Sequence, residues 1–128
     1  MRLEQARIGQ LLVPVGDLEA GVAFYRDVLG LKFLFSAPPQ MAFFDIGGIR
    51  LLVGVPPESL AQQRTSTTYF SVDDIHAVHG TLTGGGVQFS AAPHVVHRTP
   101  SSELWLAEFV DPFGNQLALM SEVRHISP

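Results

Sequence analysis

Cysteine is absent from this 128-residue chain, which excludes disulfides, thiolate zinc sites and cysteine nucleophiles. Positive charge is scarce: eight Lys and Arg stand against twelve Asp and Glu, and this net charge of −4 offers no basic stripe to a phosphate backbone. No apolar run approaches the roughly 20 residues of a membrane helix, and the N-terminal segment lacks a signal peptide's apolar core. We therefore expect a soluble, cytoplasmic protein that binds neither nucleic acid nor a membrane.

Apolar residues are plentiful, at 46% of the chain, and suit one compact globular domain or two very small modules that share a core. In the first half their spacing predicts a strand, an amphipathic helix and three more strands. Asp17 stands where an N-cap belongs, and Gly30 stands where the helix would stop. The predicted ranges are 8–15 for the first strand, 16–30 for the helix, and 31–36, 41–46 and 49–55 for the later strands, in the order βαβββ.

The second half repeats this order after a polar bridge. The pattern predicts a strand over 67–72, a helix over 73–86 and strands over 87–91, 103–110 and 115–123. Residues 15–18 recur in type at 72–75, which is 57 positions later, while Asp45 and Leu51 match Asp111 and Leu117 at 66 positions. The second half therefore carries about ten inserted residues, which we place in a polar loop over 90–103. Module one spans about 6–56, the linker about 57–66, and module two about 67–123.

A tight turn, Asp-Pro-Phe-Gly-Asn, occupies residues 111–115. Proline presets its own φ and glycine admits a left-handed backbone, so this composition reverses the chain between two strands. We expect the Asp111 carboxylate to accept backbone hydrogen bonds within the turn instead of contacting a substrate.

Taken together, the repeat, the V-G-D-L-x₅-F-Y-x₂-V-L-G-L segment over 15–31 and the D-P-F-G-N-x-L-x-L segment over 111–119 resemble the vicinal oxygen chelate superfamily. That superfamily includes glyoxalase I, extradiol dioxygenases, fosfomycin-resistance enzymes and bleomycin-resistance proteins. The resemblance covers nearly the whole chain and implies one α+β domain over 1–128. It further implies that the two βαβββ modules form an open, cup-shaped mixed sheet with helices on its outer face, often completed across a homodimer.

The resemblance also implies where a metal would be held, because the metal-dependent members take one ligand from the first strand and one from the last strand of each module. The matching positions here are Gln10, Leu52, Thr67 and Ala118. Only Gln10 offers a useful donor, since Leu52 and Ala118 carry none and a neutral hydroxyl is a poor ligand by itself. We expect no metal cofactor, although a divalent ion recruited by a rebuilt site is an open alternative.

Three other residues are candidates for such a rebuilt catalytic site. His94 and His97 flank Val95-Val96 in the inserted segment, where we weigh a ligand-binding pair against a polar loop. Glu108 interrupts an apolar strand face: if buried it needs a partner such as Arg50, and otherwise it lies at a strand end or a dimer rim. The other histidines have simpler interpretations, with His76 and His79 exposed on the second helix and His125 in the C-terminal tail.

Strand alternation sorts the remaining side chains once Gln10 is placed on the cup face. The opposite faces are uniformly apolar and would pack under the helices. The cup face mixes polar and apolar groups, which suits a small organic ligand held by a few polar anchors, although the same groups could simply fill the cup. The candidate ligand-binding residues are Gln10, Arg50, Thr67, Tyr69, Trp105 and Met120.

Three functions follow from these observations. The first hypothesis is a metal-free member that binds a small, partly apolar organic molecule in the manner of bleomycin-resistance proteins. The second is a glyoxalase-like or dioxygenase-like enzyme with a rebuilt site that uses Gln10, Glu108, His94 or His97. The third is a structural or regulatory dimer whose cup has no ligand.

Overall fold

A computed structural model describes residues 2–56 and 66–125 of the chain. It divides the chain into two compact units, residues 1–64 and 65–128, which are described separately below. The predicted linker over 57–66 lies outside the described residues except for Ser66.

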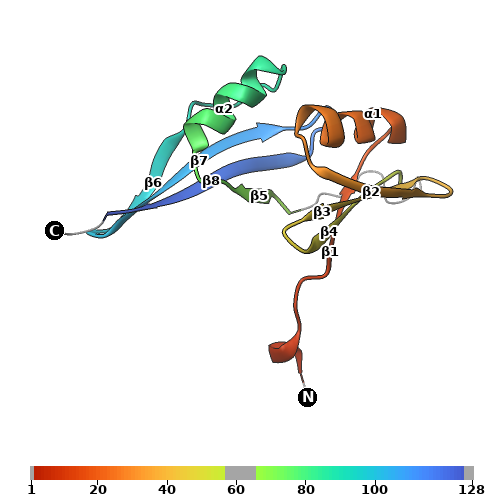
Figure 1. Ribbon diagram of the computed structural model, residues 1–128, viewed down its shortest axis with the longest axis horizontal. Helices are drawn as coiled ribbons and strands as arrows, with labels where there is room; N and C mark the ends of the chain where they lie inside the picture. The colour runs from red at the N-terminus through yellow and green to blue at the C-terminus, as the bar shows by residue number, and fades with distance from the viewer. Residues whose placement is uncertain (1, 57–65, 126–128) are drawn as a thin grey trace. The chain divides into compact units, whose positions relative to one another are not determined.

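The first unit forms a four-stranded mixed sheet with the order β1-β4-β3-β2 (Figure 1). Strand β1 runs parallel to β4, and the other neighbours are antiparallel, so the predicted βαβββ order is confirmed. The elements are the 3₁₀ turn η1 (Leu3–Gln5), β1 (Gln10–Pro14), α1 (Leu18–Val22), the π-helical segment η2 (Ala23–Val28), β2 (Lys32–Ala37), β3 (Met41–Ile46) and β4 (Ile49–Gly54).

The helix of this unit begins and ends at the predicted residues. The Asp17 carboxylate accepts a hydrogen bond from the Ala20 amide at 3.0 Å, and Gly30 leaves the helical region with a φ of 75°. Helix α1 packs against β3 and β4. Gly21 permits this approach, because a Cβ atom there would lie 3.0 Å from Val15 and 3.1 Å from Val53.

The second unit repeats the architecture with the sheet order β5-β8-β7-β6. Strand β5 runs parallel to β8, and helix α2 packs against β7 and β8 after an N-cap at Asp74. Figure 1 shows that β7 and β8 form the long part of this sheet. The elements are β5 (Thr68–Ser71), α2 (Ile75–Gly84), β6 (His94–Arg98), β7 (Ser102–Val110) and β8 (Gln116–Arg124).

The outer strand of the second unit differs from the prediction. Residues 87–91 form only an isolated bridge, between Phe89 and Phe109, and the strand itself is β6, inside the segment that was predicted to be a loop. The chain leaves the sheet after Ser90 and returns at His94, where two β-branched valines favour pairing with β7. The polar-loop interpretation of His94 and His97 is therefore wrong.

The face of each sheet that lies against its own helix forms the core, as predicted. Its largest fully buried side chains are Tyr25, Phe44, Leu51, Val53, Phe109 and Leu117. The face opposite the helix in each sheet is called the helix-free face from here on. One predicted core residue, Leu11, is exposed at the start of β1.

The turn after β7 behaves as its composition predicts. Asp111 is 3% exposed, and one of its carboxylate oxygens accepts hydrogen bonds from the amides of Phe113 and Asn115, both at 2.8 Å. Gly114 has a φ of 86°, which lets the chain turn into β8. Asp45, which matches Asp111 in sequence, is not its structural counterpart. Arg50 and Gln116 are the matching residues of β4 and β8, and Arg50 pairs with Asp45 whereas Gln116 pairs with Val110. No helix among the described residues has the length and apolarity to span a membrane.

Candidate functional site

Strand register places the first module's candidate residues on its helix-free face. Gln10 pairs with Arg50, and the next pair on the same face joins Leu12 to Leu52. Because β3 also pairs with β4, Phe43 lies beside Leu52 on this face. Gln10 and Arg50 are exposed, whereas Phe43 is buried.

The four positions where the family resemblance implies metal ligands do not fit a metal. Leu52 and Ala118 have no donor atom, and Ala118 is 0% exposed beside Tyr69 in the β5–β8 pairing. Thr67 lies just before β5 and offers only a hydroxyl. Within residues 2–56 and 66–125, no group of three His, Asp or Glu residues could hold a metal ion. A catalytic metal therefore has no site built from these residues.

Arg50 lies above two aromatic rings. Its guanidinium carbon is 5.2 Å from the centroid of the Phe43 ring and 5.9 Å from that of Phe35. The two rings contact each other with a centroid distance of 4.8 Å. Phe35 reaches this face because the outer strand carries a β-bulge between Phe33 and Phe35, which directs Phe33 to the core side against Phe44.

A second β-bulge determines where the histidines of β6 point. His94 pairs with Leu106 and His97 with Leu104, with the register shift between Val95 and His97. Both histidines therefore lie on the helix-free face, although a regular strand would direct residues three apart to opposite faces. No residue pattern in the sequence indicates this bulge, so the histidine pair could be named as a candidate but not assigned to a face.

Glu108 lies on the same face of the second module. It pairs with Ala118, which pairs in turn with Tyr69, so these three side chains form one row across β7, β8 and β5. Tyr69 is 50% exposed and Glu108 is exposed as well, so Glu108 needs no buried partner. Met120 lies in the next row, between Leu106 and Ser71.

Trp105 is separated from the other candidate residues. It alternates with Leu104 and Leu106 and faces helix α2, where its ring lies 5.0 Å from the His76 ring. His79 packs similarly on Phe89, with a centroid distance of 4.4 Å. His76 is exposed, as predicted, whereas His79 is half-buried, and each contacts an aromatic ring. The structure does not bring Trp105 to the helix-free face.

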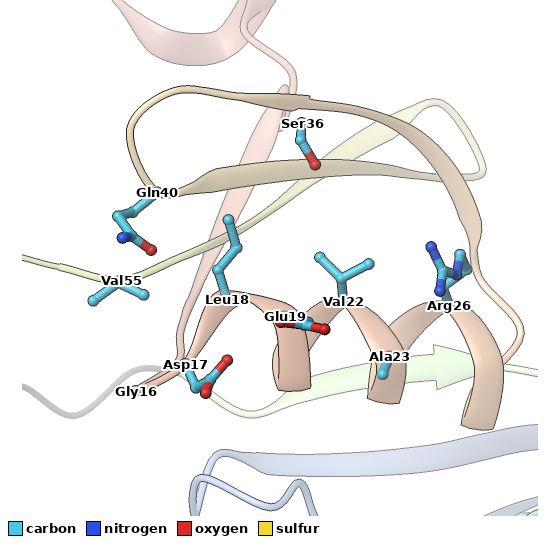
Figure 2. A pocket seen from close by; sticks show the side chains of 10 residues that line it. All are labelled: Gly16, Asp17, Leu18, Glu19, Val22, Ala23, Arg26, Ser36, Gln40 and Val55. Carbon is cyan, nitrogen blue, oxygen red and sulfur yellow. The ribbon is translucent and has the colours of Figure 1, made fainter.

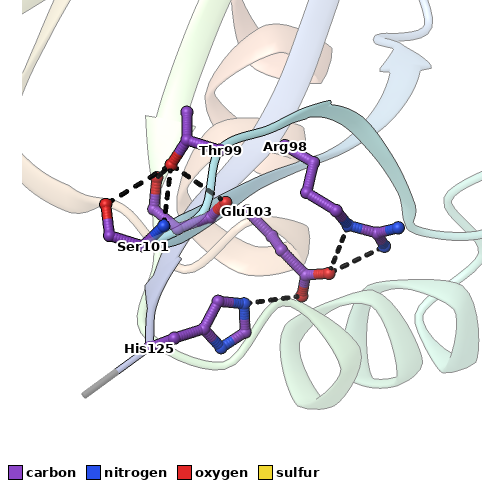
Figure 3. Close-up of polar contacts among 6 residues, drawn as sticks. Arg98, Thr99, Ser101, Glu103 and His125 are labelled. Atoms are coloured by element: carbon purple, nitrogen blue, oxygen red, sulfur yellow. Dashed lines mark hydrogen bonds and ion pairs between the residues drawn. The ribbon is translucent and has the colours of Figure 1, made fainter. Parts of the chain in front are cut away.

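A polar cluster ties the far end of the β6–β7 hairpin to the end of β8 (Figure 3). Glu103 accepts a hydrogen bond from Arg98 Nε at 2.8 Å, and His125 Nε2 lies 3.7 Å from its second oxygen. His125 therefore has a local contact that its place in the tail did not indicate. Thr99 joins Ser101 and Ser102 beside this pair. The cluster spans neighbouring strands and serves the hairpin's structure.

A groove of about 850 Å³ lies on the helix side of the first module (Figure 2). Leu18 and Val22 of α1 face the strand that carries Ser36, and Gln40 lies near one end. Two of its three charged groups are already engaged, since Asp17 caps α1 and Arg26 forms an ion pair with Asp27. The sequence does not indicate this groove, because its walls come from residues that are far apart in the helical and strand patterns.

Solved structures share this fold. A member of the glyoxalase/bleomycin resistance protein/dioxygenase superfamily from Sphaerobacter thermophilus matches with a TM-score of 0.73 and 24% identity, over 91% of this chain and 97% of that one. Lactoylglutathione lyase from Agrobacterium tumefaciens matches with a TM-score of 0.69 and 24% identity, over 91% and 93%. A family enzyme from Burkholderia phytofirmans gives 0.71 and 18%, over 91% and 98%. At these identities the likeness concerns the fold alone.

No curated protein matches the chain in sequence. The model of the glyoxalase/bleomycin resistance protein/dioxygenase superfamily, however, matches residues 7–119, which cover both modules and the turn at Asp111. That match agrees with the two βαβββ units and with the fold of the solved structures. The chain belongs to the glyoxalase/bleomycin resistance protein/dioxygenase superfamily.

Proposed function

We propose that this protein binds a small, partly apolar organic molecule without a metal ion. One observation carries the proposal: the positions where the resemblance implies metal ligands hold Leu52 and Ala118, which cannot ligate. The helix-free faces nevertheless combine exposed apolar side chains with a few polar groups, as ligand sites do. The residues that we expect to contact ligand are Gln10 and Arg50 in the first module and Thr67, Tyr69 and Met120 in the second.

Binding by protein stripped of metal tests the proposal. Protein dialysed against EDTA is screened with a set of small organic molecules by ligand-observed NMR, and every hit is measured again after Zn²⁺ is added. We expect affinities that do not change with Zn²⁺ and that fall when Gln10 or Tyr69 is replaced by Ala. Thr81→Ala, an exposed change on α2, is the control. Binding that appears only with the metal would overturn the proposal.

A second candidate function is catalysis without the family's usual ligands. The β6 bulge places His94 and His97 on the face that carries Glu108, and His94 is the diagonal neighbour of Glu108 across the β6–β7 pairing. Diagonal neighbours in an antiparallel pair have backbones about 7 Å apart, which a carboxylate and an imidazole can bridge through a substrate. Such a pair can accept and return a proton.

Turnover separates the two candidates. Since a structural neighbour is a lactoylglutathione lyase, the chain is incubated with methylglyoxal and glutathione, and lactoylglutathione is measured. The binding proposal predicts none above the uncatalysed reaction. Formation that is abolished by Glu108→Gln but retained by the exposed β8 control Glu122→Gln would favour the enzyme.

A further inference from the structure

From the helix-free face of the first module, we infer that the ligand is an apolar organic anion, with a carboxylate or a similar planar acid attached to a ring or chain. The inference rests on the proposed function, which leaves the charge of the ligand open. Its basis is the Arg50 guanidinium, which lies above Phe35 and Phe43 at an exposed part of the sheet.

Arg50 keeps its charge available for a ligand. In the described part of the chain it takes part in no ion pair, whereas Arg26 is paired with Asp27 and Arg98 with Glu103. The strand-register partners of Arg50 are Gln10 on β1 and Asp45 on β3. Asp45 is in turn the register partner of Lys32 on β2. Two cations and one carboxylate thus share this part of the face, which leaves it net positive.

The aromatic rings hold the guanidinium in place. A cation above a ring face is attracted by the ring's quadrupole, and here two rings act on the same group. A guanidinium restrained in this way loses less side-chain entropy when it binds, and its planar fork matches the two oxygens of a carboxylate. An arginine that only made the surface soluble would not need two aromatic rings beneath its guanidinium.

Exposed apolar side chains beside the guanidinium can bind the apolar part of the ligand. Phe35 is 45% exposed and Leu12 is 49% exposed, although each lies on a strand where burial would be favourable. Leu12 follows Gln10 on the same face, so an acid held by Arg50 places its apolar part along these side chains. The Gln10 amide, the register partner of Arg50, can donate a further hydrogen bond to the acid.

The opposite charge preference has little support on this face. A cationic ligand would meet Arg50 and Lys32, with Asp45 between them as the single carboxylate in their register rows. The charges of the first module's helix-free face therefore favour an anionic ligand over a cationic one.

Two matched probes, 2-naphthoate and its neutral amide 2-naphthamide, test the inference. Each is titrated into the full chain while amide chemical shifts are followed by NMR. We expect 2-naphthoate to bind at least about tenfold more tightly, as a charge-assisted hydrogen bond provides, with the largest shifts around Gln10 and Arg50. Arg50→Met, which keeps the aliphatic stem, should abolish the ratio. Phe35→Ala should weaken both probes and lower the ratio only in part, because the Phe43 ring still lies beneath the guanidinium. Arg26→Met is the matched control and should change neither.

The possible results distinguish failure of the anion preference from failure of metal-free binding. Equal affinity of the two probes, or an unchanged ratio in Arg50→Met, overturns the anion preference and leaves metal-free binding intact. Failure of both probes to bind at millimolar concentration also overturns it. A preference for 2-naphthoate that requires added Zn²⁺ overturns the proposed function as well.

Discussion

The two modules share one architecture and differ in the chemistry of their helix-free faces. The first module presents Arg50 above aromatic rings, while the second presents Glu108 and the β6 histidines, with Tyr69 on β5 at the opposite edge of the same face. Their core faces, in contrast, are built alike from aliphatic and aromatic side chains. The fold therefore constrains the helix side of each sheet, and the other side is free to specialise.

Length is the second difference between the modules. Strands β7 and β8 each have nine residues, against six in β3 and β4. The added length is stabilised at its far end by Arg98, Glu103 and His125. The first module has a two-residue turn, Gly47-Gly48, where the second has the Asp111 turn.

The largest difference in stability between the modules is expected between Asp111 and Asp45, the residue that matches it in sequence. Asp111→Ala leaves the half-buried amides of Phe113 and Asn115 without their acceptor, which should cost about 3 kcal/mol in the free energy of unfolding. Asp45→Ala in the first module should stay within about 0.5 kcal/mol. Urea unfolding followed by circular dichroism checks both, with Trp105 fluorescence reporting on the second module. Similar losses in the two variants would contradict the different roles assigned to these residues.

Helix packing gives the next largest difference. Gly21→Val adds side-chain atoms where even a Cβ would lie 3.0 Å from Val15, and should cost about 2 kcal/mol. Its counterpart 57 positions later is Val78, which is only half-buried, so Val78→Ala should cost less than about 1 kcal/mol. Thermal unfolding of both variants measures the contrast. Gly21→Val unfolding like the wild type would show that the close approach of α1 is unnecessary.

The helix N-caps should behave alike in the two modules. Asp17 and Asp74 each accept a backbone hydrogen bond from the residue three positions later at 3.0 Å. Replacing either by Ala should cost about 1 kcal/mol, and Asn should restore most of it. Urea midpoints of the four variants test this. A large inequality between the Ala variants would mean that one cap has a role beyond its helix.

Ion pairs should give the smallest effects. Glu103→Gln, which removes the partner of Arg98 between two strands, should cost less than about 1 kcal/mol. Asp27 lies on an exposed helix, and the hydrogen bond from Arg26 lowers the pKa of its carboxyl. Its contribution is therefore present above the ordinary carboxyl pKa of about 4 and is lost as the pH falls through the lowered value. The melting temperatures of wild type and Asp27→Asn should converge in acid, and divergence there would contradict the assigned sign.

Much of the fold could be predicted because periodicity and capping are local properties. The spacing of apolar residues predicted the βαβββ order, and the composition of residues 111–115 predicted the hydrogen bonds of Asp111. The β-bulges could not be predicted, because they depend on how a neighbouring strand pairs. They decide that Phe35 and both β6 histidines lie on the helix-free faces.

For the candidate site, the sequence predicted which residues share a sheet face but not which side chains contact one another. Alternation from Gln10 correctly grouped Arg50 and Leu52 on one face, and Tyr69 with Met120 on the other module's face. It could not show that Arg50 lies over two phenylalanine rings, because those rings come from strands whose register the sequence does not state. Trp105 was included for its chemistry, yet its contact with His76 places it under α2.

Metal analysis of the purified protein distinguishes metal-free binding from chemistry at a bound ion. Protein purified without chelator, and the Gln10→Ala variant, are dialysed against Zn²⁺, Ni²⁺ or Mn²⁺, and bound metal is measured by mass spectrometry. Because Leu52 and Ala118 provide no donor, we expect far less than one ion per chain for both proteins. A stoichiometric divalent ion in the wild type that disappears in Gln10→Ala would contradict it.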